Sequence, residues 1–229
     1  QQMTGAIAKS YYAQKIGVKP EDMVVVSVMP CIAKKYETHR PELQVNGIRD
    51  VDYSITTREL AKMFKEGGID LRYMPDEEFD NPLGESTGAG VIFGVTGGVL
   101  EAALRTVYEE VTGQELTDVN FTAVRGLKDV REATIDLGAR KVRVAAGSGL
   151  GNARTILEAI EKGTSQYDVI EIMACPGGCI NGGGQPYTHE RIEMVHLRTQ
   201  ALYQIDAGSA IRKSHENPAL KTLYEEFLG

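Results

Sequence analysis

Two cysteines, Cys175 and Cys179, lie four positions apart in the segment EIMACPGGCINGGGQP, residues 171–186. The Pro-Gly-Gly between them disfavours both a helix and a regular strand, and three more glycines follow at positions 182–184. Thiolates are ligands that soft metals prefer, and glycines let the backbone close around a bound group. The spacing therefore indicates a metal-binding loop rather than a turn alone.

A third cysteine, Cys31, lies far upstream in the segment MPCIAKKYE, residues 29–37. Three thiols are one fewer than the four ligands of a tetrahedral metal site. A lone cysteine is often a small buried apolar residue, so Cys31 is either a residue of that kind or a metal ligand. Lys34 follows three positions later. It either faces the same pocket, where burial requires an anionic partner, or begins a solvated helix.

Thiols in a glycine-rich loop favour an iron–sulfur cluster over zinc. Structural zinc sites usually take four protein ligands, and of the four histidines His189 is the nearest to the loop in sequence. Iron–sulfur clusters bind thiolates and accept hydrogen bonds from surrounding groups. A phosphate site is a weaker alternative, because neither glycine run matches a nucleotide-binding motif and GVTGG, residues 94–98, is too short to be specific.

Composition narrows the classes of protein further. The 229 residues are 42% hydrophobic and carry a formal charge of −7, which supports a packed core and argues against nucleic acid as a partner. The sequence contains no run of about 20 apolar residues, so we expect no membrane span. An odd number of cysteines does not suit a disulfide framework and favours a reducing compartment, hence the cytoplasm.

Strands and helices alternate along the chain and place both cysteine motifs at strand ends. Helical periodicity covers residues 4–16, and the β-branched run at 23–30 predicts a buried strand that ends beside the first motif. A second buried strand at 167–175 delivers the second motif in the same way. Open α/β sheets hold their sites at the carboxyl ends of strands, so the pattern predicts an α/β protein with its chemistry there.

The other expected elements follow from similar patterns. They are a strand at 52–55, a helix capped by Thr57 and closed by Gly67 and Gly68, a polar loop at 74–90, a short strand and then a helix at 97–111, a strand at 119–126, a hairpin over Gly138, a helix at 151–163, and helices at 189–206 and 216–227. No clean linker separates them, so any lobes are expected to be interwoven in sequence.

The two cysteine motifs closely resemble two of the three signature motifs of the catalytic domain in the large chain of iron-only ([FeFe]) hydrogenases. They are MPCIAKKYE and MACPGGCINGGGQP, residues 173–186. RDVDYSITTRELAKM, GAGVIFGVTGGVLEAALR, VRGL and RKSHENPAL resemble the same family. The resemblance runs over nearly the whole chain. It implies an α/β fold of two interwoven lobes, with mixed sheets flanked by helices. It also implies that residues 1–229 are a partial catalytic domain, with the first cysteine motif and ferredoxin-like domains expected upstream.

The cofactor that this resemblance implies is the H-cluster, a [4Fe-4S] cluster joined through a cysteine to a di-iron unit with CO, cyanide and dithiolate ligands. By motif, Cys31 and Cys175 resemble ligands of the [4Fe-4S] cluster, and Cys179 resembles the ligand that also bridges to the di-iron unit. Lys34 resembles the lysine that hydrogen-bonds a cyanide. The residues implied to act in catalysis are Lys34 and Cys179, and those implied to surround the cofactor are Gln1, Met29, Lys34, Phe93, Gly94 and Met173.

The implied reaction is the reversible reduction of protons to dihydrogen. Expected partners are a ferredoxin or NAD(P)-linked subunits, together with the rest of the catalytic domain, which carries the fourth cysteine; nucleic acid and membrane are not expected. Three alternatives stay open: an iron–sulfur assembly relative, a hydrogen-sensing member with slow turnover, and a glycine-rich α/β domain that binds zinc. Family members occur in cytoplasm and periplasm, and we expect the cytoplasm, with the periplasm as the alternative.

Overall fold

A computed structural model describes residues 1–80, 82–127, 130–138, 140–189 and 191–229. The chain forms two compact units, and each unit is assembled from separate stretches of sequence. The first unit contains residues 1–83, 182–187 and 225–229, and the second contains residues 84–181 and 188–224. This alternation confirms the prediction of two interwoven lobes with mixed sheets and flanking helices.

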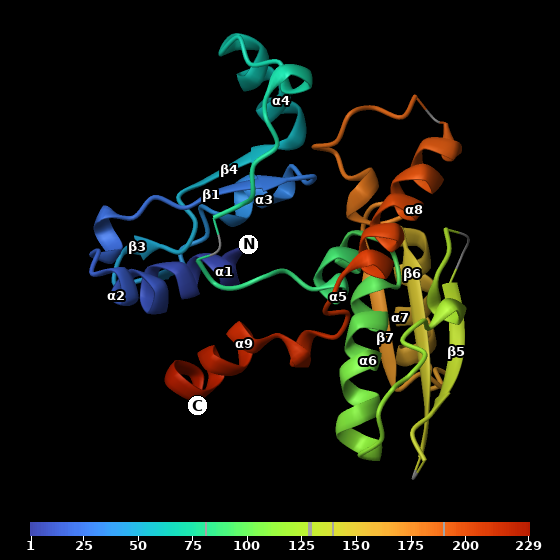
Figure 1. Cartoon of the computed structure of the whole chain (residues 1–229). Helices are drawn as coiled ribbons and strands as arrows, with labels where there is room; N and C mark the ends of the chain where they lie inside the picture. Colours follow the sequence, from blue (N-terminus) through green and yellow to red (C-terminus); the bar gives the residue numbers. More distant parts are fainter. Residues whose placement is uncertain (81, 128–129, 139, 190) are drawn as a thin grey trace. The chain divides into compact units, whose positions relative to one another are not determined.

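The first unit begins with a helical segment and contains two small sheets (Figure 1). The segment comprises α1 (Gln2–Ile7), a π-helical turn (Ala8–Tyr12) and α2 (Ala13–Ile16), and it ends at Gly17 in the left-handed conformation, as predicted. Its other elements are β1 (Val26–Met29), α3 (Ala33–Glu37), β2 (Gln44–Val45), β3 (Ile48–Arg49), β4 (Tyr53–Thr56) and α4 (Thr57–Glu66), with short 3-10 turns at Pro20–Asp22 and Leu71–Tyr73. Strand β1 pairs with β4 in parallel, and β2 pairs with β3 as a hairpin over an Asn-Gly turn.

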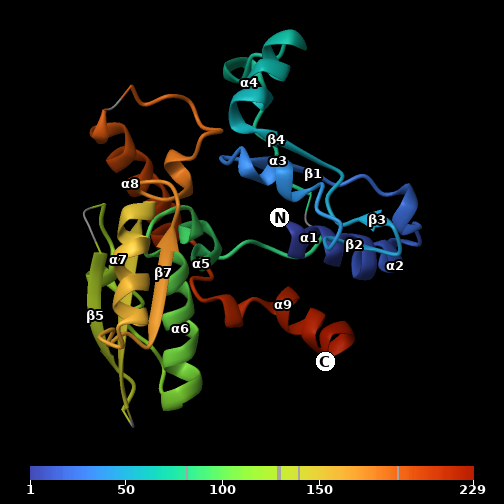
Figure 2. The same ribbon diagram turned by 180° about the vertical axis from the view of Figure 1, so that it is seen from behind.

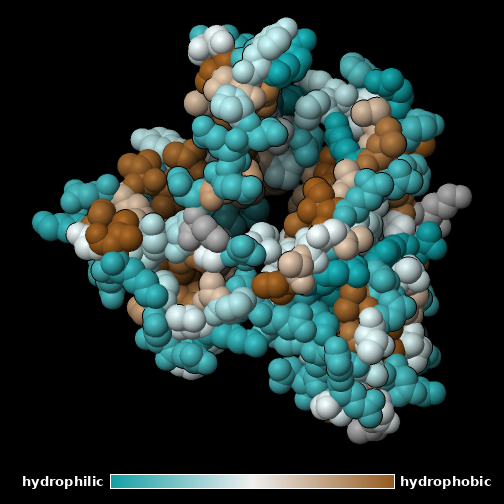
Figure 3. Space-filling model, in the orientation of Figure 1, coloured by the Kyte–Doolittle hydropathy of each residue, from teal (hydrophilic) through white to brown (hydrophobic). Residues whose placement is uncertain are grey.

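Two expectations for this unit need correction. Strand β1 is not buried on both faces, because Val26 and Val28 remain 51% and 43% exposed. Its sheet has only two strands among the described residues, and Figure 3 shows apolar side chains gathered on the surface of this unit. The cap of α4 is Thr56 rather than Thr57: its hydroxyl accepts from Glu59 N (3.2 Å), and its own N–H donates to the Glu59 carboxylate (2.8 Å).

The second unit packs helices against a three-stranded sheet. Its elements are α5 (Gly88–Val91), a 3-10 turn (Ile92–Gly94), α6 (Gly98–Thr112), a 3-10 turn (Thr122–Val124), β5 (Val130–Asp136), β6 (Lys141–Ser148), α7 (Leu150–Glu161), β7 (Val169–Met173), a 3-10 turn (Cys179–Asn181), α8 (Ile192–Gly208), a 3-10 turn (Ser214–Glu216) and α9 (Pro218–Leu223). A π-helical turn (Tyr224–Leu228) follows and leads back to the first unit.

The sheet has the order β5-β6-β7, with β5 and β6 antiparallel and β6 and β7 parallel. The hairpin turns at Gly138, as predicted, and α7 forms the crossover between the parallel strands. Figures 1 and 2 show α6 and α7 on opposite faces of this sheet. Leu100 and Leu104 of α6 share a buried core with Val142, Val144 and Ala146 of β6. None of the described helices is both long enough and apolar enough to cross a membrane.

Two predicted strands of this unit are wrong. Residues 88–94 form helical turns, because the Thr87 hydroxyl accepts from Gly90 N (3.2 Å) and because Gly88 lies directly against α8. Residues 119–126 form no ladder, and the Val119 carbonyl accepts a hydrogen bond from the Arg105 side chain (2.9 Å) instead of one from a strand. Tertiary contacts therefore override β propensity in both segments.

A buried ion network fixes α6 to α8. Arg105, fully buried, donates to both oxygens of Asp206 (2.7 and 2.9 Å) and to Glu101 (2.8 Å). Its remaining donors reach the carbonyls of Val119 (2.9 Å) and Arg212 (2.8 Å). All donors of the guanidinium are therefore paired, which is the condition under which a buried charge is tolerated.

Replacing Asp206 with Asn is expected to destabilise the fold by about 3–5 kcal/mol, because it leaves the buried Arg105 charge without its main counter-ion. Urea unfolding at neutral pH measures the change. The matched control is Glu158→Gln, which breaks an exposed helix-surface pair with Lys162 and is expected to cost less than about 1 kcal/mol. Equal destabilisation by both variants would contradict the assignment of the network as the main tie between α6 and α8.

Candidate metal centre

The loop that carries Cys175 and Cys179 follows β7 directly and is held in a tight turn. Gly178 N donates to the Cys175 carbonyl (2.9 Å), and Gly177 N donates to the Ser148 hydroxyl (3.1 Å) at the end of β6. Gly177 and Gly178 have φ angles of +83° and +98°, which side-chain-bearing residues rarely adopt. Cys175 is half-buried and Cys179 is exposed. The loop therefore presents two thiols on a backbone that only glycine allows.

The segment 94–96 lies against this loop. Thr96 N donates to the Gly177 carbonyl (3.2 Å). A Cβ built on Gly178 would lie 2.7 Å from Thr96 N, 2.8 Å from the Gly94 carbonyl oxygen and 2.9 Å from the Met173 sulfur. Two predicted cofactor-binding residues, Gly94 and Met173, are thus brought to the residue that precedes Cys179. Phe93, also predicted, precedes this segment in a 3-10 turn and is 45% exposed.

Two further residues, Thr96 and Glu171, shape this loop, and neither was predicted as a site residue from the sequence. Among the described residues, the Thr96 hydroxyl oxygen is buried and has no hydrogen-bond partner. Glu171 of β7 accepts from Gly97 N (2.6 Å) and Leu100 N (2.7 Å), so it caps the first turn of α6. Burial raises the pKa of the Glu171 carboxyl, and the backbone hydrogen bonds oppose that shift. The TGG sequence drew attention only as a weak phosphate motif, and nothing local in β7 marked Glu171 as a cap.

Cys31 lies in the first unit, between Pro30 and the start of α3, and is half-buried. The end of the glycine loop, residues 182–187, belongs to the same unit. Gly184 N donates to the Pro30 carbonyl (2.8 Å), and a Cβ on Gly184 would lie 2.9 Å from the Met29 carbonyl oxygen. A Cβ on Gly183 would lie 3.4 Å from Ile32. Gly184 therefore lets the loop backbone lie against the backbone that precedes Cys31, and Gly183 packs against the Ile32 side chain that follows it.

Lys34, one turn after Cys31, forms an ion pair with Glu37 at the end of α3. Gln1 Nε2 donates to Glu37 Oε1 (3.1 Å) and to the Lys34 carbonyl (3.2 Å), and Gln1 Oε1 accepts from the Ser27 hydroxyl (2.6 Å). Burial raises the pKa of the Glu37 carboxyl, but the hydrogen bonds from Lys34 and Gln1 outweigh it and bring the pKa below its ordinary value. Gln1 and Lys34, predicted for the same pocket, are thus linked within one unit.

The predicted site residues fall into two groups, one in each unit. Gln1, Met29, Cys31 and Lys34 belong to the first unit, and Phe93, Gly94, Met173, Cys175 and Cys179 belong to the second. Within each group the residues lie on neighbouring segments around a cysteine motif. The combination of both groups around one cofactor stays a prediction.

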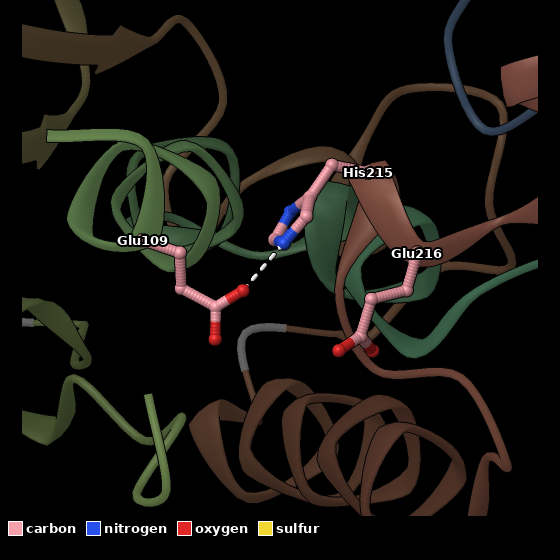
Figure 4. A group of neighbouring side chains, drawn as sticks. All are labelled: Glu109, His215 and Glu216. Atoms are coloured by element: carbon pink, nitrogen blue, oxygen red, sulfur yellow. Dashed lines mark hydrogen bonds and ion pairs between the residues drawn. The ribbon is translucent and has the colours of Figure 1, made fainter. Parts of the chain in front are cut away.

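A separate cluster of potential metal ligands lies in the second unit (Figure 4). Glu109, His215 and Glu216 place ligand atoms within 4.8 Å of one another. The ammonium of Lys213, however, lies 2.7 Å from Glu109 Oε1 and 2.9 Å from Glu216 Oε1, and His215 Nε2 lies 2.6 Å from Glu109 Oε2. The positive charge that the two carboxylates require is therefore supplied by Lys213, and the cluster is a structural ion network.

The protein has an α/β fold in which both cysteine motifs lie against glycine-rich backbone, and thiolates in such loops are the ligands that the sequence predicts for a metal. The family model described as iron only hydrogenase large subunit, C-terminal domain, matches residues 1–183, and that described as iron hydrogenase small subunit matches residues 192–229. The chain therefore belongs to the family of C-terminal domains of iron-only hydrogenase large subunits, as its cysteine motifs predict.

Individual relatives agree with this assignment. The chain is 58% identical over 229 residues to the NADP-reducing hydrogenase subunit HndD of Solidesulfovibrio fructosivorans, and the match covers 100% of this chain and 39% of the relative. It is 49% identical over 201 residues to the periplasmic [Fe] hydrogenase large subunit of Nitratidesulfovibrio vulgaris, over 88% of this chain and 48% of the relative. The chain thus spans less than half the length of these two curated relatives.

Solved structures show the same fold. A variant of the [FeFe]-hydrogenase HydA1 from Chlamydomonas reinhardtii aligns with a TM-score of 0.82 and 42% identity, over 100% of this chain and 64% of that one. The same values hold for a HydA(deltaEFG) structure that describes stepwise H-cluster assembly in [FeFe]-hydrogenase. More distant relatives are named as cytosolic iron-sulfur assembly components, and the Bos taurus protein is 31% identical over 235 residues, covering 100% of this chain and 48% of its own length.

Gly178→Ala is expected to destabilise the second unit by more than the roughly 1–2 kcal/mol that a left-handed backbone costs a residue with a Cβ. The added methyl would also clash with Thr96 N and the Gly94 carbonyl oxygen. The control is Gly113→Ala in the same unit, which has a left-handed backbone (φ +65°) but no atom within 4 Å of the new Cβ. Urea unfolding separates the two contributions, and equal losses of stability would show that the close approach at Gly178 is unimportant.

Lys213→Met is expected to destabilise the protein at neutral pH by on the order of 1–3 kcal/mol, because it leaves Glu109 and Glu216 without their shared cation. The hydrogen bond from Lys213, with those from Leu116 N and His215, lowers the pKa of Glu109 to about 2 in the folded state, against about 4.3 when unfolded. Because the folded pKa is the lower one, this stabilisation is complete above about pH 4.3 and is lost as the pH falls towards 2. Unfolding measured from pH 7 to pH 3 should show the difference between wild type and variant narrowing below pH 4.3; a constant difference would contradict the prediction.

Proposed function

We propose that this chain is the part of an [FeFe]-hydrogenase that holds the H-cluster and interconverts protons and dihydrogen, an oxidoreductase reaction in which two protons and two electrons give one dihydrogen. The observation that supports this most directly is the loop of Cys175 and Cys179, closed at Gly178 against Gly94, Thr96 and Met173. A thiolate pair in such a loop suits an iron–sulfur cluster, and the family membership of the chain specifies which one.

The residues present fit that cofactor by their chemistry. Cys31 and Cys175 carry free thiols, and soft thiolate ligands select iron–sulfur clusters or zinc over hard cations. The buried Thr96 hydroxyl, which has no partner among the described residues, lies on the segment against the loop, where a bound group would supply the missing acceptor. A purely structural turn offers no reason to keep a hydroxyl that costs roughly 1–3 kcal/mol when buried without a partner.

In this proposal each predicted residue has a distinct task. Cys31 and Cys175 would bind the [4Fe-4S] cluster, and Cys179 would be the ligand that it shares with the di-iron unit. Met29 and Met173 give an apolar wall that limits water, and Phe93 and Gly94 border the same loop.

The ammonium of Lys34 would donate a hydrogen bond to a cyanide, and Gln1, which donates to the Lys34 carbonyl, would border the same cofactor. When bound, the H-cluster supplies the redox chemistry, while the protein supplies ligands, a site of low polarity and oriented donors.

Partners and compartment follow from the same assignment. The NADP-reducing name of one relative supports a ferredoxin- or NAD(P)-linked electron route, and the remainder of the catalytic domain is proposed to supply the fourth cysteine. Cytoplasmic localisation stays our prediction, and the periplasmic name of another relative supports the alternative.

An assembly-type iron–sulfur protein is the second candidate, because relatives of that name align with the whole chain. Such a protein would hold the cluster cysteines but would have no cyanide to accept from the Lys34 ammonium, whose partner among the described residues is Glu37. The observation that favours the hydrogenase is the pocket chemistry beyond the thiols: a methionine sulfur at the cysteine loop and an oriented lysine one turn after Cys31.

The test is anaerobic reconstitution and maturation of the full-length protein that contains this chain, followed by iron, sulfide and zinc analysis and infrared spectroscopy in the CO and cyanide region. We expect iron, sulfide, CO and cyanide bands, and dihydrogen turnover. Cys175→Ser and Cys179→Ser should each remove most of the turnover, and Ser165→Ala, a similarly small change in the second unit, should leave it intact. Zinc without sulfide would favour the zinc-binding domain. A cluster without CO and cyanide bands would favour the assembly relative, and full bands without turnover would favour the hydrogen sensor.

A further inference from the structure

The ion pair of Lys34 with Glu37 belongs to a larger group of contacts in the first unit, which we call the Glu37 network: Gln1, Ser27, Lys34 and Glu37. One carboxylate oxygen of Glu37 accepts from the Lys34 ammonium, and the other accepts from Gln1 Nε2 at 3.1 Å. Glu37 is therefore the residue through which the lysine and the glutamine are held together.

The orientation of the Gln1 amide in this network is set by its partners. Its two N–H groups reach Glu37 and the Lys34 carbonyl, and its oxygen accepts from Ser27, a buried residue of β1. If the amide were flipped, its N–H groups would point at the Ser27 hydroxyl, and its oxygen would face the two acceptors, so the hydrogen bonds to Glu37 and to the Lys34 carbonyl would be lost. The network thus ties the end of α3 to the strand that precedes Cys31.

The Lys34 ammonium is held but not saturated. An ammonium has three donors, and among the described residues the Lys34 nitrogen donates only to Glu37. Its side chain is 35% exposed and that of Glu37 is 27% exposed, so neither charge is sealed from a ligand. A fixed ammonium with donors to spare is suited to a second, anionic acceptor.

An isolated surface pair three residues apart on a helix contributes only a few tenths of a kcal/mol, and five-residue α3 gives such a pair little support of its own. Here, however, Glu37 is oriented by Gln1, and Gln1 by a buried serine. The rotamer of Lys34 is therefore fixed by a network whose other end is rooted in a strand. Such an arrangement is expected where the direction of a donor matters more than stability.

We propose that Glu37 is a positioning residue: it aims the Lys34 ammonium, together with the Gln1 amide, at the cyanide ligand of the bound di-iron unit. The inference rests on the proposed hydrogenase function, because it needs that anion as the acceptor. In the opposite role, Glu37 would withhold Lys34 from the ligand. The two roles predict opposite effects of removing the Glu37 carboxylate on turnover.

The experiment compares three variants of the full-length, matured protein with the wild type. Glu37→Gln keeps the shape of the side chain, but it replaces one of the two oxygens, which accept separately from Gln1 and Lys34, with an NH2 group that only donates. Ser27→Ala removes the far end of the network without touching either charge. The matched control is Glu42→Gln, which removes the same charge from an exposed pair with Arg40 in the same unit.

We expect the cyanide stretching bands to shift in Glu37→Gln and, by a smaller amount in the same direction, in Ser27→Ala, with iron content unchanged. Turnover should fall roughly tenfold in Glu37→Gln, equivalent to about 1.4 kcal/mol, and stay at the wild-type rate in Glu42→Gln. Urea unfolding of each variant reports whether the fold is retained. If Glu37→Gln does not fold, the smaller shift in Ser27→Ala decides the matter alone.

Two outcomes overturn the inference and are distinct from a failure of the proposed function. Cyanide bands in Glu37→Gln and Ser27→Ala that match those of the wild type would show that the network does not position a ligand donor. Increased turnover in Glu37→Gln would assign Glu37 the withholding role, and unchanged turnover would show that it does not position the lysine. A wild-type protein without CO and cyanide bands would instead refute the proposed function itself.

Discussion

The close approach of two backbones at Gly178 is the constraint on which the second unit's part of the site depends. Any side chain there would overlap the backbone of Gly94 and Thr96 and the sulfur of Met173. A hydrogen bond from Thr96 N to the Gly177 carbonyl holds the two segments together. Glu171 also stabilises the approach, because it accepts from the first turn of α6 and so fixes that turn to β7. The parallel pair β6–β7 and the start of α6 thus set the conformation of the loop together, so the direction of its thiols follows from the fold.

The first unit uses glycine in the same way around Cys31, but for another partner. Gly183 and Gly184 lie against Ile32 and the Met29–Pro30 backbone. The two runs of glycines after Cys175 therefore serve different units: Gly177 and Gly178 close the loop in the second, and Gly183 and Gly184 pack in the first. This division explains why the segment is richer in glycine than a turn between two cysteines requires. The rotational freedom that glycine has in the unfolded chain makes such a loop costly to order, so each approach must be stabilised by contacts from its own unit.

Sequence alone predicted the features that short-range chemistry determines. The helix that ends at Gly17, the hairpin over Gly138 and the strand before Cys175 follow from turn residues and periodicity, and all three are present. The short strand predicted before the helix at 97–111 and the strand predicted at 119–126 are wrong, because contacts with α8 and with the Arg105 side chain determine those segments, and no local pattern encodes them.

The candidate site shows the same limit. The cysteines were visible as a motif, whereas Glu37, Glu171 and Thr96 matter only through residues far away in sequence. None of them has an unusual local sequence. Glu37 ends a short helix, Glu171 lies within a strand, and Thr96 precedes a pair of glycines. Long-range partners of this kind become apparent only when the strands and helices are assembled.

Most of the segment matched by the small-subunit family model, residues 192–224 of 192–229, is a structural part of the second unit, and residues 225–229 belong to the first. Asp206 of that segment is the counter-ion of the fully buried Arg105, and Lys213 neutralises Glu109 one turn further along α6. Without the segment, Arg105 would keep only Glu101 as a counter-ion, and Glu109 would lose both Lys213 and His215, so α6 would pay a penalty for charges that are only partly compensated. Because α6 begins at the residues that contact the cysteine loop, the same penalty would act on the helix that positions the proposed site. The integrity of that site therefore depends on both family segments being folded together.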